Sequence, residues 1–168
     1  ALKTFDQKNK TVLIRFDLNI PLNKRASTIS DRITRIKNPI QNLLNKNNKV
    51  VILSHLGRPK GKRNDELSLN QIISSLENVL QKKIIFLSNC IGDEIEKKIN
   101  SLSQDSIILL ENCRFHEGEE QNDKIFASEL SKLADVYIND AFACSHRAHA
   151  SIEAITNFIP SYCGELLH

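Results

Sequence analysis

The sequence has few glycines and widely spaced cysteines, and each shortage excludes a common kind of site. Only five glycines occur in 168 residues. No two of them have the spacing of a Walker A loop or of a dinucleotide-binding fingerprint. The four cysteines form no Cys-x-x-Cys pair, so we expect reduced thiols in a cytoplasmic protein rather than a disulfide framework.

Long apolar runs and a strong net charge are missing as well. No run approaches the length of a membrane span, and the first residues lack a signal-peptide pattern, so we expect no membrane partner. Aromatic residues make up only 5% of the chain, and the formal net charge is only +3. A groove for nucleic acid needs spread-out cations with interleaved stacking aromatics, so we expect no nucleic-acid partner either.

What is present is a repeated alternation of short apolar runs and helical patterns. Runs rich in Val and Ile predict strands of a parallel sheet, buried on both faces, at 11–16, 49–54, 83–87, 106–111 and 135–140. Apolar residues at helical spacing predict helices over 31–46, 68–81, 93–102 and 122–134. Pro39 is expected to kink the first helix. We therefore predict one doubly wound (Rossmann-like) α/β domain over residues 1–168, with helices on both faces of a parallel sheet.

Polar side chains follow four of the five predicted strands. Ligands of open α/β sheets bind outside the carboxyl ends of the strands. We expect one edge to gather Asp17 and Asn19, His55 and Arg58, Asn112 and Arg114, and Asp140, His146 and Arg147. Asp140 is expected to bind backbone amides in the turn that follows it. The acidic residues Glu117, Glu119 and Glu120 are expected to form a solvated loop.

The arginines in these positions indicate an anionic ligand. Arg32 lies in the first turn of a predicted helix, capped by Ser30 or Asp31, where the helix dipole disfavours a cation. With the strand-end arginines it places half of the chain's eight arginines on one rim. Guanidinium groups bind phosphate and carboxylate bidentately, whereas the oxygens of Asp17 and Asn19 accept from hydroxyls. The predicted ligand is small, carries at least two anionic groups and bears a hydroxyl, as a phosphorylated hydroxy acid does.

Other interpretations remain open at this point. Cys144, His146 and His149 have a compact spacing that could ligate zinc, although no fourth ligand is evident. Cys144 could instead be a nucleophile beside His146, because positive surroundings lower the pKa of a thiol. For the protein as a whole, the alternative to an enzyme is a non-catalytic module that binds an anion.

The strand-end motifs, taken in order, resemble phosphoglycerate kinase. They are "RFDLNIPL", "SDRITRI", "SHLGRPKG", "LENCRFHEGEE" and "NDAFACSHRAHAS". The resemblance implies a monomeric, glycolytic two-domain enzyme that moves a phosphoryl group reversibly between 1,3-bisphosphoglycerate and ADP. The N-terminal domain would bind phosphoglycerate, and a C-terminal domain absent from this chain would bind Mg-ATP or Mg-ADP. No cofactor or metal is then expected on the present chain.

The resemblance also implies a role for each matching residue. Asp17 and Asn19 would contact the hydroxyl and carboxylate end of 3-phosphoglycerate. Arg32 would be the catalytic residue, nearest the transferring phosphoryl group, where it neutralises charge. The residues implied to hold the non-transferred phosphate are His55, Arg58, Arg114 and Arg147. The chain alone is therefore expected to bind 3-phosphoglycerate without catalysing its phosphorylation.

Overall fold

Six parallel strands form the sheet of the computed structural model, which describes residues 4–20, 31–141 and 146–167. The strands are β1 (Thr11–Phe16), β2 (Lys49–Leu53), β3 (Ile85–Leu87), β4 (Ile107–Leu110), β5 (Val136–Asp140) and β6 (Ser161–Cys163). Their order is β3-β4-β2-β1-β5-β6, and every neighbouring pair is parallel. The five predicted strands are confirmed, and β6 is an additional strand that the sequence patterns do not predict.

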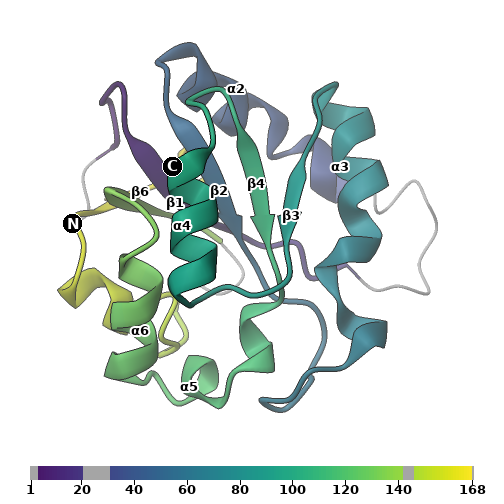
Figure 1. The fold of residues 1–168 in the computed structure, drawn as a ribbon, viewed down its shortest axis with the longest axis vertical. Helices are drawn as coiled ribbons and strands as arrows, with labels where there is room; N and C mark the ends of the chain where they lie inside the picture. The colour runs from purple at the N-terminus through teal and green to yellow at the C-terminus, as the bar shows by residue number, and fades with distance from the viewer. Residues whose placement is uncertain (1–3, 21–30, 142–145, 168) are drawn as a thin grey trace.

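Helices cover both faces of this sheet (Figure 1). α2 (Lys37–Asn45) and α3 (Ile73–Leu80) lie on one face, and α4 (Asp93–Ser101) and α6 (Lys124–Ser131) lie on the other. The short helix α5 (Glu117–Glu120) lies at the lower edge in Figure 1, where the chain leaves β4. Single 3-10 turns are η1 (Asp65–Leu67), η2 (Leu69–Ile72), η3 (Cys113–Phe115), η5 (Ala154–Asn157) and η6 (Glu165–Leu167). The predicted doubly wound α/β fold is confirmed.

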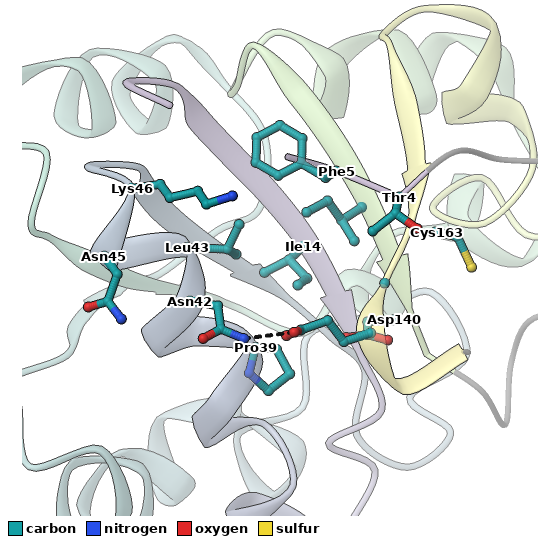
Figure 2. A pocket seen from close by; sticks show the side chains of 13 residues that line it. Thr4, Phe5, Ile14, Pro39, Asn42, Leu43, Asn45, Lys46, Asp140 and Cys163 are labelled. Carbon is teal, nitrogen blue, oxygen red and sulfur yellow. Dashed lines mark hydrogen bonds between the residues drawn. The ribbon is translucent and has the colours of Figure 1, made fainter. Parts of the chain in front are cut away.

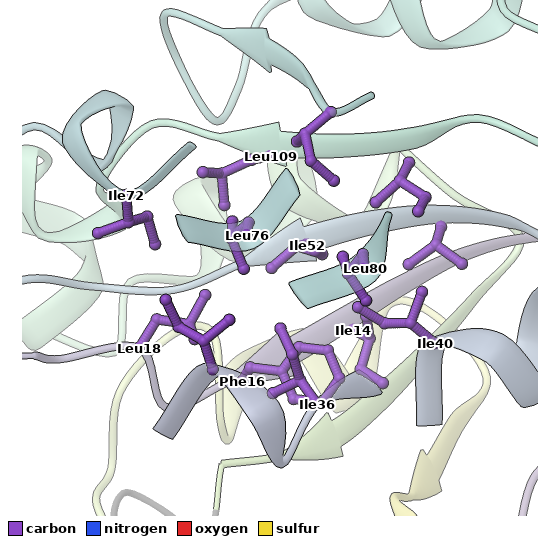
Figure 3. Packing of buried hydrophobic residues seen from close by; sticks show 14 of the residues in the cluster. Ile14, Phe16, Leu18, Ile36, Ile40, Ile52, Ile72, Leu76, Leu80 and Leu109 are labelled. Carbon is purple, nitrogen blue, oxygen red and sulfur yellow. The ribbon is translucent and has the colours of Figure 1, made fainter. Parts of the chain in front are cut away.

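Successive residues of the central strands pack into two separate hydrophobic cores. Ile14 and Phe16 of β1 pack with Ile40 of α2 and Leu76 of α3 on one face of the sheet (Figure 3). Leu13 points to the opposite face and packs in the core that includes buried residues of α4 and α6. Because strand side chains alternate between faces that are both covered, the sheet offers a ligand access mainly at the strand ends.

The helix predicted over 31–46 is interrupted, as the proline suggests. Residues 31–34 are helical, residues 35–36 form a turn, and α2 begins at Lys37. Pro39 lies in the first turn of α2, and its ring has no N–H to donate to the carbonyl of Arg35. The kink is therefore confirmed, and it lies four residues before the proline. Ser30, one of the two predicted capping residues, lies outside the described residues.

Candidate functional site

Four neighbouring strands bring the predicted polar residues to one edge of the sheet. β4, β2, β1 and β5 are consecutive in the sheet order, and the loop after each of them carries predicted site residues. A cavity of about 170 Å³ at this edge is lined by Asp17, Asn19, His55, Gly57, Arg58, Arg114 and Arg147. β3 and β6, which contribute no residue to this cavity, are the two edge strands. Every predicted site residue except Arg32 therefore lines a single cavity.

Arg32 lies in the adjoining cleft, which has a volume of about 440 Å³ and also contains Arg35 and Asp140. Asp17 lines both the cleft and the smaller cavity. The Nη1 atom of Arg32 lies 3.8 Å from Oδ2 of Asp17 and donates to the carbonyl oxygen of Asn19 at 3.2 Å. These contacts hold the Arg32 side chain at the boundary between the two spaces. Since 39% of that side chain is exposed, the ion pair itself contributes little to stability.

Gly57 ties two of the site loops together. Its amide donates to Oδ1 of Asn19 at 2.8 Å, and its carbonyl accepts from Nη1 of Arg114 at 3.3 Å. The φ angle of Gly57 is +63°, and a Cβ atom there would lie 2.7 Å from Cδ2 of Leu67. With its amide oxygen bound to Gly57, Asn19 has its side-chain NH₂ left for a ligand. The amide side chain therefore suits an anionic acceptor, rather than the hydroxyl donor that its oxygen was expected to bind.

Arg114 is a buried cation whose hydrogen bonds are incomplete. The residue is only 4% exposed, and Asn112 caps the turn η3 that carries it by accepting from its amide at 3.1 Å. Within the described part of the chain, its Nε and Nη2 atoms have no hydrogen-bond partner. Leaving a buried charged donor unsatisfied is costly. The arrangement therefore favours an anionic ligand that accepts these hydrogen bonds in the cavity.

His55 presents a neutral imidazole to the cavity. The residue is 2% exposed. Burial lowers the pKa of His55 to about 2, and the nearby cations Arg15, Arg114 and Arg147 lower it further together with His149. Of the other basic residues that line the cavity, Arg58 and Arg147 are exposed. The permanent positive charge of the site therefore comes from its three arginines.

Asp140 has a structural role, but its partner is distant in sequence. Its Oδ1 atom accepts from the amide of Leu166, 26 residues later, at 2.8 Å. Burial raises the pKa of Asp140 to about 6, and the nearby Glu165 raises it further, while hydrogen bonds from backbone amides oppose the shift. The turn directly after β5, which Asp140 was expected to bind, includes residues 142–145, and these lie outside the described residues. In the described part, Asp140 holds the 3-10 turn η6.

The prediction of a solvated acidic loop is wrong for one of its three residues. Glu117 and Glu120 are exposed, whereas Glu119 has an exposed fraction of 0%. Its carboxylate accepts from the amide of Ser151 at 2.7 Å and from the hydroxyl of Ser151 at 2.5 Å. Glu119 escapes the solvated role because a chain segment 32 residues later supplies donors to both carboxylate oxygens.

The alternative metal site and nucleophile both involve Cys144, which lies outside the described residues. Of the predicted histidines, His146 is exposed and His149 is buried. Among the residues that the structure does describe, no group of three or more His, Cys, Asp and Glu side chains could hold a metal ion. A helix long and apolar enough to span a membrane is likewise not found in that part of the chain.

A second hollow, of about 340 Å³, is mainly apolar and lies apart from the arginines (Figure 2). Phe5, Ile14 and Leu43 are among the residues that line it. Asn42 closes one end by donating to Oε1 of Glu165 at 2.7 Å. Without an arginine in its lining, this hollow does not offer the bidentate donors that a phosphate prefers.

Two residues of the site are missing from the sequence prediction. Gly57 stands within a motif that was singled out, but glycines were tested only for phosphate-loop spacing. Arg15 was counted within the apolar run of β1, although its exposed fraction is 0% and it contacts His55. A charged residue inside a strand that is buried on both faces is the signal that could have identified it, because such a charge must be paired.

Comparisons with known proteins agree on one family. The family model described as phosphoglycerate kinase matches residues 2–168. A phosphoglycerate kinase of Wolbachia sp. subsp. Drosophila simulans (strain wRi) is 47% identical over 164 residues, which cover 98% of this chain and 41% of that protein. One from Coprothermobacter proteolyticus is 42% identical over 168 residues and is covered to 43% of its length.

Solved structures show the same relationship. The crystal structure of phosphoglycerate kinase from Pyrococcus horikoshii OT3 matches with a TM-score of 0.85 and 29% identity, over 97% of this chain and 42% of that one. The structure from Coxiella burnetii matches with a TM-score of 0.82 and 34% identity, over 97% and 40%. The chain thus spans about 41% of the length of the curated relatives it matches. A family model that covers nearly all of its residues shows that the chain belongs to the phosphoglycerate kinase family.

Proposed function

We propose that this chain is the N-terminal, phosphoglycerate-binding domain of a phosphoglycerate kinase, and that the cavity binds 3-phosphoglycerate and 1,3-bisphosphoglycerate. The observation that carries the proposal is the buried guanidinium of Arg114, whose Nε and Nη2 lack partners among the described residues. They belong to a cavity that Arg58 and Arg147 also line. A phosphate group supplies the oxygens that such converging donors need.

The non-transferred phosphate occupies the part of the cavity formed by Arg58, Arg114, Arg147 and His55. Phosphate oxygens accept from the guanidinium groups, and His55 contributes a neutral donor. At the other side, the Asp17 carboxylate accepts from the substrate hydroxyl, and the free NH₂ of Asn19 donates to the carboxylate end. The acidic and the basic lining residues thus match the opposite chemical ends of one small ligand.

Arg32 acts in the adjoining cleft, beyond Asp17. There the guanidinium neutralises charge that develops on the phosphoryl group as it moves, in the way an arginine finger does. The distance of 3.8 Å to Asp17 and the hydrogen bond to the Asn19 carbonyl hold it close to the substrate. Phosphoryl transfer needs positioning and charge neutralisation rather than a protein nucleophile, and these residues provide both.

The nucleotide belongs to a second domain that this chain does not contain. Mg-ATP or Mg-ADP, when bound there, donates or accepts the transferred phosphoryl group. We assign no metal ligand to the described residues, which bring no three acidic, His or Cys side chains together. The chain alone therefore binds substrate as a monomer without catalysis, as part of a cytoplasmic glycolytic enzyme whose two domains close around both substrates.

Calorimetry and an activity assay on the same preparation test the proposal. Titration with 3-phosphoglycerate is expected to show saturable binding, and glycerate, which lacks the phosphate, is the matched control. A coupled assay with 3-phosphoglycerate, ATP and magnesium is expected to show no turnover, because the donor nucleotide has no pocket and the effective molarity gained by holding both reactants is lost.

Two results would contradict different parts of the proposal. Equal affinity for glycerate and 3-phosphoglycerate would show that the cavity is not a phosphate site. Robust phosphoryl transfer by the chain alone would overturn the division of labour between two domains. An open reading frame that continues past Leu167 into a second α/β domain would support the enzyme over the non-catalytic binding module.

A further inference from the structure

A chain of buried polar side chains connects α5 to the cavity. It starts from Arg15, which lies on the same face of β1 as Leu13, where the second hydrophobic core packs. The exposed fraction of Arg15 is 0%. A guanidinium held in such surroundings is tolerated only if its donors are satisfied, so its partners are informative.

The donors of Arg15 reach three other residues of this network. Its Nε atom donates to the hydroxyl of Ser151 at 3.1 Å, and its Nη1 atom donates to the hydroxyl of Ser54 at 3.3 Å. Its Nη2 atom lies 2.6 Å from Nδ1 of His55. The fork of Arg15 is thus held from two sides while it touches a residue that lines the ligand cavity.

Glu119 anchors the far end of this chain. Its Oε2 atom accepts from the Ser151 hydroxyl at 2.5 Å, and its Oε1 atom accepts from the Ser151 amide at 2.7 Å. Glu119 and Ser151 are both 0% exposed. Because the Ser151 hydroxyl donates to Glu119, its oxygen is directed to accept from Arg15. The polarity of each link in the chain is therefore defined.

The last link determines the protonation of His55. A guanidinium carries only donors and does not lose its proton in proteins. Nδ1 of His55 must therefore accept from Arg15, and a neutral ring then carries its proton on Nε2. This assignment follows from the chemistry of the partner rather than from the ring orientation alone.

The surrounding charges oppose a second proton on His55. Arg15 reaches it from β1, Arg114 from η3, and Arg147 and His149 from the segment after β5, and all four lower its pKa, to which burial contributes most. Arg58 and Asp17 also line the cavity. The one carboxylate in this set lies beside Arg32, so cations dominate around the imidazole.

We propose that Glu119, Ser151 and Arg15 are positioning residues that fix His55 as a neutral donor, with its proton on Nε2 and available to an anion in the cavity. The part of this inference that concerns the anion rests on the proposed function, whereas the part that concerns the proton does not. The arrangement gives the site a donor that neither titrates nor rotates as conditions change near neutral pH. It resembles the way in which outer residues fix the tautomer of a metal-bound histidine.

Nitrogen NMR of the unaltered chain is the first test. Long-range proton–nitrogen spectra of ¹⁵N-histidine-labelled protein distinguish a protonated ring nitrogen from an unprotonated one. His55 is expected to show a single Nε2–H tautomer from pH 5 to pH 8, with no titration. A proton on Nδ1, or a titration within this range, would overturn the inference without reference to any ligand.

Variants supply the second test. Ser151→Ala removes the acceptor of Arg15 Nε, and Glu119→Gln removes the carboxylate that orients Ser151. Both are expected to produce a mixture of His55 tautomers and to weaken 3-phosphoglycerate binding about tenfold. Glu120→Gln, an exposed neighbour, is the control and is expected to change neither. Folding of each variant is checked by its amide spectrum, and the measurement on the unaltered chain remains decisive if a variant does not fold.

The outcomes separate the two proposals. A single Nε2–H tautomer in the unaltered chain, lost in Ser151→Ala, supports the positioning role even if 3-phosphoglycerate does not bind, and in that case only the proposed function fails. Variants that keep both the tautomer and the affinity of the unaltered chain would show that Glu119 and Ser151 merely fill space.

Discussion

The amide of Gly57 donates to Oδ1 of Asn19 at 2.8 Å, which joins the loop after β2 to the loop after β1. The carbonyl of the same residue accepts from Arg114 at 3.3 Å, so a third loop is attached at the same point. Both bonds depend on a backbone conformation with φ of +63° and on contact with Leu67. One glycine thus sets the relative positions of an amide side chain and a buried guanidinium.

Gly57→Ala is expected to weaken substrate binding as well as stability. A positive φ costs a residue with a Cβ atom about 1–2 kcal/mol, and the new atom would also press on Leu67. Gly92→Ala is the matched control, because Gly92 also has a positive φ, of 114°, but its Cβ would meet nothing within 4 Å. Urea unfolding should show a loss of stability in both variants, and calorimetry should show weaker 3-phosphoglycerate binding only in Gly57→Ala. Normal binding by Gly57→Ala would contradict the tie between the loops.

The arginines of the cavity are expected to contribute similarly to affinity. Arg58→Ala, Arg114→Ala and Arg147→Ala should each weaken 3-phosphoglycerate binding by about 2 kcal/mol, the scale of a charged hydrogen bond lost at a partly buried site. Titration calorimetry at fixed salt measures the effect. Lys62→Ala, an exposed cation in the loop after β2, controls for the general loss of positive charge. Unchanged affinity in all three arginine variants would mean that the cavity takes a different ligand.

The fold was predictable because its strands carry a strong local signal. Strands that are buried on both faces need continuous β-branched and aliphatic runs, and the runs at β1 and β2 are of this kind. β6 has only three half-buried residues, so no run reveals it. It pairs with β5 through a register that joins Ser161 to Tyr137. Such pairing depends on the assembled sheet and cannot be deduced from the residues of β6.

The site was predictable to the extent that the fold gathers strand ends. Parallel strands place the residues that follow them at one edge, and the cavity residues lie there. The burial of Glu119 depends instead on donors from Ser151, 32 residues further on. In sequence, Glu119 is one of three acids in four residues, which is typical of a solvated turn. Long-range partners of this kind decide which charged residues are buried, and a single sequence does not show them.

Arg32→Ala is expected to act on the rate rather than on binding. In a full-length protein that includes the nucleotide-binding domain, the turnover number should fall by about 10³-fold, as for loss of an arginine finger, with a much smaller change in the Michaelis constant. Arg35→Ala is the control, because Arg35 lines the same cleft but is exposed. Steady-state kinetics separates the two effects. A rise in the Michaelis constant with unchanged turnover would contradict a role at the transferring phosphoryl group.

Asp140 is expected to make stability depend on pH. Its pKa is raised from 3.8 to about 6 in the folded chain, so the folded state binds a proton that the unfolded state has already lost. The stabilisation is fully present below pH 4 and is lost as the pH rises through 6. Relative to Asp140→Asn, which keeps an acceptor for the Leu166 amide, the unaltered chain should lose on the order of 2 kcal/mol between pH 4 and pH 7. Urea unfolding of both proteins across this range measures the difference, and a difference that is independent of pH would contradict the raised pKa.

Asp17 lies on the wall shared by the small cavity and the larger cleft. A carboxylate at that wall repels negative charge, so a ligand is most comfortable when its anionic groups lie on either side and its uncharged, hydroxyl-bearing middle lies against Asp17. The two spaces therefore act as a gauge of charge spacing. Inorganic phosphate fills only one of them, and pyrophosphate brings its charges too close together to avoid the wall. A three-carbon chain with an anion at each end has the separation that this gauge selects.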